Sequence, residues 1–120
     1  MPILDVEFVG EPMPELRTGL AQRLADACGQ VLQSPPKSTW VRLRVLDVND
    51  YAENLAAPRT AAPVFLRVLL RDLPESKERA HLARELAQVI AALCARPIER
   101  VHVLFEAAAE GRIAFGGEMG

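Results

Sequence analysis

Residues 2–9, PILDVEFV, and residues 64–71, VFLRVLLR, follow one pattern. Leu4, Val6 and Phe8 alternate with the residues between them, and 62 positions later Leu66, Val68 and Leu70 do the same. Apolar side chains at every second position are typical of a strand with one buried face. The recurrence predicts two copies of one structural unit within the chain.

Each predicted strand is followed by a predicted helix and a second strand. From about Pro14 apolar residues recur at helical spacing as far as Leu32, and a strand is expected from Thr39 to Val48. The second copy repeats this helical stripe with Leu82, Leu86, Val89, Ile90 and Leu93. Its last strand begins near His102. The sequence therefore predicts pseudo-repeats at about 2–51 and 63–120, joined by an Ala- and Pro-rich linker at 52–62.

Two such units predict a single α+β domain over residues 1–120. We expect a four-stranded sheet with both helices on one face, and parallel strands within each unit. The face away from the helices mixes apolar and charged side chains, namely Ile3, Asp5, Glu7, Arg42, Arg44, Phe65, Arg67, Leu69 and Arg71. That mixture predicts contact with other subunits in a ring.

Composition narrows the classes of partner. Of the 120 residues 50% are hydrophobic, and the net charge is -2 without any broad basic region, so we expect neither nucleic acid nor a membrane as partner. Without a signal-like segment, a cytoplasmic protein is expected. Cys28 and Cys94 lack metal-site spacing, so reduced thiols are expected and neither a metal nor another cofactor is predicted.

The strand beginning at Pro2, the repeated unit and the ending GRIAFGG at residues 111–117 together resemble the tautomerase superfamily, typified by 4-oxalocrotonate tautomerase. The doubled unit is similar to the fused branch of that superfamily. The resemblance implies a homotrimer and a cofactor-independent tautomerase acting on a small-molecule carboxylate substrate.

In such a family Pro2 would be the catalytic base. Once Met1 is removed, Pro2 becomes a secondary amine on a rigid ring, and apolar walls and nearby arginines would lower its pKa toward neutrality. Its counterpart in the second repeat is Val64, which has no free amine, so one working site per chain is expected.

The resemblance also implies candidate substrate-binding residues. Arg71 stands where larger superfamily members place a carboxylate-binding arginine, and a bidentate grip would also stabilise a developing dienolate. Trp40 and His102 stand where the short tautomerases carry an arginine, so stacking or hydrogen bonding would replace that charge. Ile113 and Phe115 are expected as apolar walls of a hairpin that reaches a neighbouring subunit's pocket.

Two alternatives remain open at this level. Decarboxylases and dehalogenases of the same superfamily activate water with a carboxylate, which Asp72 or Glu106 would have to supply. A trimeric binding or scaffold protein without activity is the other alternative, because a fold does not by itself determine function.

Overall fold

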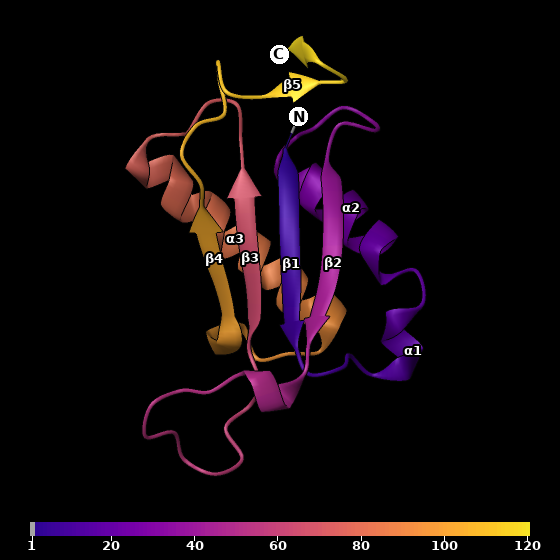
Figure 1. The fold of residues 1–120 in the computed structure, drawn as a ribbon, viewed down its shortest axis with the longest axis vertical. Coiled ribbons are helices and arrows are strands. Elements are labelled where there is room, and N and C mark those ends of the chain that lie inside the picture. Colours follow the sequence, from indigo (N-terminus) through magenta and orange to yellow (C-terminus); the bar gives the residue numbers. More distant parts are fainter. Residues whose placement is uncertain (1) are drawn as a thin grey trace.

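A computed structural model describes residues 2–120 and places a four-stranded sheet in front of two long helices (Figure 1). The strand order is β2-β1-β3-β4, with β1 parallel to β2, β3 parallel to β4, and β1 antiparallel to β3 at the centre. The predicted α+β class and the parallel pairing within each unit are confirmed. The strands are β1 (Ile3–Val9), β2 (Trp40–Leu46), β3 (Val64–Leu69) and β4 (Val101–Phe105).

The helices are α1 (Pro14–Arg17), α2 (Leu20–Val31) and α3 (Ser76–Cys94), and short 3-10 turns cover Val48–Asp50 and Ile98–Arg100. A small hairpin of β5 (Ala114–Phe115) and β6 (Glu118–Met119) ends the chain. This hairpin lies at the end of the sheet where β1 begins, while the loop between β2 and β3 lies at the opposite end (Figure 1). We refer to these as the Pro2 end and the linker end.

The core lies between the sheet and the helices, on the face that the alternation predicts. Leu4, Val6 and Phe8 of β1 are at most 1% exposed, as are their neighbours on β3. Helix residues such as Leu24 and Ile90 cover them from the other side. Burial of each such side chain contributes about 1.5–3 kcal/mol, so this layer is the main source of stability.

The first helical segment differs from the single helix expected from Pro14 onward. The helix breaks after Arg17, and Gly19 takes a left-handed φ of 71° before α2 begins. Arg23 of α2 donates hydrogen bonds to the carbonyls of Leu16 and, at 2.8 Å, Thr18. These bonds satisfy carbonyls that a broken helix leaves without intrahelical donors, which explains why the break is tolerated.

The sheet face opposite the helices carries paired charges and exposed apolar side chains. Arg42 donates two hydrogen bonds to Asp5, at 2.6 and 2.9 Å, and Arg67 lies 3.0 Å from Glu106. Leu104 on the same face is 51% exposed. No helix within residues 2–120 is long and apolar enough to span a membrane.

Candidate active site

A cleft of about 730 Å³ opens at the Pro2 end between the sheet and the two long helices. Pro2 heads β1 and Arg71 follows β3, and both line this cleft. Its apolar lining comes from both helices and from the residues that directly follow α2 and β3, namely Ala27, Val31, Leu32, Leu70, Leu82 and Val89. The cleft therefore brings Pro2 and the Arg71 guanidinium to a lining that is partly apolar.

Strand pairing explains why Pro2 and Arg71 meet. Ile3, the first residue of β1, pairs with Leu69 at the end of antiparallel β3. Arg71 follows two residues after Leu69, so it arrives where β1 begins. On the other side the backbone N–H of Trp40 donates to the Pro2 carbonyl at 2.9 Å, which anchors Pro2 to β2.

Arg71 is held at the mouth of the cleft by the segment that follows β4. The backbone N–H of Glu110 donates to the Arg71 carbonyl at 3.1 Å, and its carboxylate lies 3.7 Å from the guanidinium. The Arg71 side chain is 59% exposed, so this ion pair is weak and leaves donors free.

Trp40 and Phe115 lie at the Pro2 end but outside the lining of the Pro2 cleft. Their rings meet edge to face with centroids 5.6 Å apart, and the Trp40 indole donates to the Lys37 carbonyl at 2.9 Å. Gly116 and Gly117 form the hairpin turn with φ of 59° and 88°, which L side chains adopt at a cost. Ile113 is half-buried at the base of this hairpin, where its carbonyl accepts from the N–H of Gly120.

His102 lies at the linker end and does not share the Pro2 cleft within one chain. It pairs with Phe65 in the parallel register of β3 and β4, and the two rings are 5.5 Å apart. Because β4 starts where β3 starts, its first residues are placed far from the start of β1. Of the predicted site residues, the structure gathers Pro2, Arg71, Trp40 and Phe115 at one end and leaves His102 at the other.

Solved structures with the same architecture cover nearly the whole chain. A fused 4-OT, described as a wild-type symmetric trimer, is 21% identical, with a TM-score of 0.79 over 98% of this chain and 94% of that one. A malonate semialdehyde decarboxylase inhibited by 3-bromopropiolate is 18% identical, with a TM-score of 0.70 over 95% and 90%. Macrophage migration inhibitory factor of Toxoplasma gondii is 15% identical, with a TM-score of 0.69 over 95% and 96%.

The chain has the tautomerase fold. No protein-family model and no curated protein sequence matches it, so the likeness is one of structure. The tautomerase fold of this chain places Val64, the counterpart of Pro2, at the linker end beside a different set of side chains.

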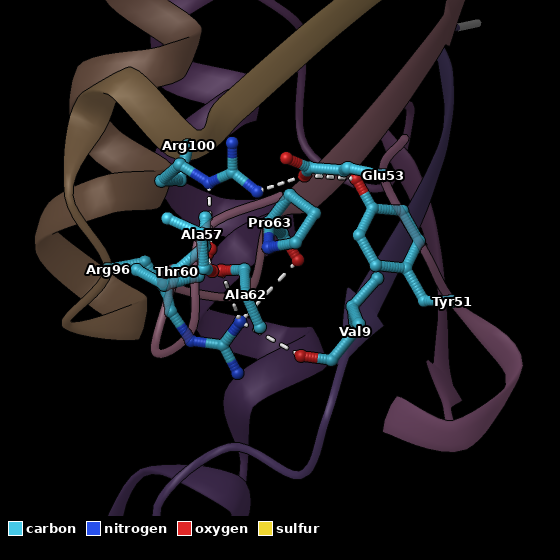
Figure 2. Close-up of polar contacts among 10 residues, drawn as sticks. Val9, Tyr51, Glu53, Ala57, Thr60, Ala62, Pro63, Arg96 and Arg100 are labelled. Carbon is cyan, nitrogen blue, oxygen red and sulfur yellow. Dashed lines mark hydrogen bonds and ion pairs between the residues drawn. The ribbon is translucent and has the colours of Figure 1, made fainter. Parts of the chain in front are cut away.

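At the linker end of this tautomerase fold, Arg96 occupies the space beside β3 (Figure 2). Its guanidinium donates to the carbonyls of Val9 and Ala62, both at 3.1 Å, and makes longer bonds to those of Gly10 and Pro63. It also lies 5.4 Å from the centroid of the Phe8 ring, and burial lowers its pKa. In the second repeat the Arg96 side chain is therefore held by backbone carbonyls near Val64. In the first repeat the corresponding position near Pro2 has an open cleft.

Arg100 also binds the linker, in addition to Arg96. It pairs with Glu53 and donates to the Ala61 carbonyl at 2.8 Å, while the Tyr51 hydroxyl donates to Glu53 at 2.6 Å (Figure 2). The hydrogen bond from Arg100, followed by that from Tyr51, holds the pKa of Glu53 below its ordinary value. This network fastens both ends of the linker that the sequence predicts as a simple connection.

Four charged or titratable residues of the Pro2 cleft were not expected there as a group. Asp72 follows Arg71, while Glu78, His81 and Glu85 project from α3, and His81 pairs with Glu85. From the sequence alone, Asp72 is an acid of unknown position. The signal for the other three was their spacing, because residues three, four and seven apart share one face of a helix.

No group of three or more His, Cys, Asp or Glu side chains among residues 2–120 is arranged to hold a metal ion.

Proposed function

We propose that the chain is a tautomerase that interconverts the enol and keto forms of a small 2-oxo or 2-hydroxy-dienoic acid, with Pro2 as the general base. The observation that carries this proposal is that Pro2 and Arg71 line one cleft. Met1, whose removal would free the Pro2 amine, lies outside the described residues.

The proposed reaction returns every atom and electron to the substrate. The Pro2 amine takes the enol hydroxyl proton, the O–H electron pair forms the carbonyl, and the C=C electrons take a proton at carbon from the resulting prolinium. Arg71 would hold the substrate carboxylate through paired N–H donors and stabilise the negative charge that develops on oxygen. The cleft needs no further reactant for this cycle.

The residues around Pro2 differ from the nearby arginines that are expected from the sequence to lower the pKa of its amine. Among the described residues lining the cleft, three carboxylates accompany the single arginine. Carboxylates favour a protonated amine, whereas apolar neighbours such as Val31 and Leu70 disfavour it. A neutral Pro2 would therefore depend on desolvation rather than on cationic neighbours.

Assembly into a homotrimer is part of the proposal. The sheet face opposite the helices leaves Trp40 46% and Leu104 51% exposed, and a similar structure is described as a symmetric trimer. In a trimer, Ile113 and Phe115 would help to exclude water from a Pro2 site. His102, far from Pro2 in its own chain, would act only at a site that a neighbouring subunit contributes.

One observation favours a second candidate, which is hydration or decarboxylation. Asp72 lines the Pro2 cleft, where its carboxylate would activate water, whereas Glu106 is paired with Arg67 on the other face of the sheet. Release of carbon dioxide or halide from a test acid would favour this candidate over simple tautomerisation.

The proposal is tested by comparing wild type with Pro2→Ala after intact mass has shown that Met1 is absent. Conversion of phenylenolpyruvate and 2-hydroxymuconate is followed, with the uncatalysed rate subtracted. We expect Pro2→Ala to lower kcat/KM by about 10²- to 10⁴-fold, as loss of a general base does. Pro14→Ala, at the exposed start of α1, is the matched control. Equal rates for wild type and Pro2→Ala would remove Pro2 as the base and favour the hydration candidate. No turnover by wild type lacking Met1 would favour the scaffold alternative.

A further inference from the structure

The wall of the Pro2 cleft formed by α3 is acidic. Glu78, His81 and Glu85 lie on one face of α3 and line the cleft together with Asp72 from the turn after β3. His81 contacts Glu85 through Nε2, and the two side chains stay 64% and 38% exposed at the rim of the cleft. Three carboxylates thus share the space into which Pro2 faces.

Arg71 supplies the permanent positive charge among the described residues that line the cleft. It is the one arginine among the described residues that line the cleft, no lysine is among them, and part of its charge is directed to Glu110 at 3.7 Å. A ligand with one carboxylate would satisfy this guanidinium. A second carboxylate on the same ligand would have to approach Asp72, Glu78 or Glu85.

The remaining lining suits an uncharged extension. Leu70, Leu82 and Val89 supply apolar surface, and Gln30 and Gln33 add polar groups without charge. Like charges brought together without compensation are a strong element of discrimination against a wrong ligand.

We propose that the acidic face of α3 restricts the Pro2 cleft to substrates with a single carboxylate and an uncharged tail. The carboxylate binds Arg71, the tail lies along Leu82 and Val89, and Asp72, Glu78 and Glu85 reject dianions. This inference names the substrate class of the site and rests on the function proposed above.

Binding of two unreactive acids tests the inference without any need for turnover. Sorbate and trans,trans-muconate share one six-carbon diene, and they differ in that muconate carries a carboxylate where sorbate carries a methyl group. Their dissociation constants are measured by calorimetry on the full chain lacking Met1. We expect sorbate to bind at least roughly tenfold more tightly than muconate, as like-charge contact requires.

The double variant Glu78→Gln/Glu85→Gln connects that preference to α3. Glutamine keeps the size of the side chain and a hydrogen-bonding partner for His81, so circular dichroism should match wild type. We expect this variant to bind muconate more tightly and to reduce the ratio to about threefold or less, while sorbate affinity stays nearly constant. Glu11→Gln/Glu99→Gln, at two exposed positions at the linker end, removes the same number of charges and should keep the wild-type ratio.

Several outcomes would overturn the inference: tighter or equal binding of muconate by wild type, an unchanged ratio in the double variant, or no binding of either acid. Pro2→Ala separates it from the proposed function, because loss of the amine should leave the preference for sorbate intact. Absence of turnover together with retained preference would contradict the tautomerase proposal and support the charge selection.

Discussion

Trp40 fixes the start of β1, because its backbone N–H donates to the Pro2 carbonyl at 2.9 Å while its ring contacts Phe115 edge to face. One residue thereby connects the proposed base to the C-terminal hairpin. The hydrogen bond belongs to the backbone and would survive a change of side chain, whereas the ring contact would not. Substitutions at Trp40 can therefore separate the two effects.

Trp40→Ala should destabilise the C-terminal hairpin, because the Trp40 ring lies outside the Pro2 cleft and contacts Phe115. Loss of an aromatic pair costs about 0.5–1.5 kcal/mol, and we expect the free energy of unfolding in urea to fall by about that amount. Trp40→Phe keeps an aromatic ring against Phe115 and should recover most of the loss. An unchanged unfolding midpoint in Trp40→Ala would contradict this view.

Arg71→Ala should lower kcat/KM by about 100-fold, because the substrate carboxylate would lose its paired donors. Arg71→Lys keeps the charge without the planar fork and should fall between Ala and wild type. Glu110→Gln removes the anion 3.7 Å from the guanidinium and should lower KM by about twofold. An unchanged KM in Arg71→Ala would assign Arg71 to its surface ion pair alone.

Arg96→Met should destabilise the fold rather than impair the Pro2 site. The guanidinium donates to backbone carbonyls from the end of β1 and from the linker, and methionine would leave these acceptors without their donors. We expect the free energy of unfolding in urea to fall by about 2 kcal/mol. Arg84→Met on the exposed side of α3 should stay within about 0.5 kcal/mol of wild type. Equal urea midpoints for the two variants would show that the hydrogen bonds of Arg96 add no stability.

Cys28 and Cys94 should resist alkylation in the folded protein at mildly alkaline pH. Burial raises the pKa of Cys28 to about 12 and that of Cys94 to about 11, so almost no reactive thiolate is present. Iodoacetamide should modify both only in denaturant, as read by intact mass. Since both pKa values are higher in the folded than in the unfolded chain, stability should fall as the pH rises above the unfolded-state value. Rapid modification of the folded chain would contradict this.

The predictions made from sequence succeeded where the information was local. Alternation at Leu4, Val6 and Phe8 and the helical stripe around Leu24 depend on residues close to one another in the chain, so their periods reveal strand, helix and buried face. The break at Gly19 was missed because the apolar stripe continues across it. The donors from Arg23 that make the break tolerable come from the next helix.

The sequence by itself determined the paired units, their elements, the buried face of the sheet and the resemblance that singles out Pro2. Only the tertiary structure decided which of the candidate residues meet. Antiparallel pairing of β1 with β3 brings Arg71 to Pro2, and the parallel start of β4 leaves His102 at the opposite end. Packing of α3 over the sheet turns His81 and Glu85 into cleft residues. The physical reason is that periodicity records which side of an element is buried, whereas strand order and direction decide which distant side chains share a space.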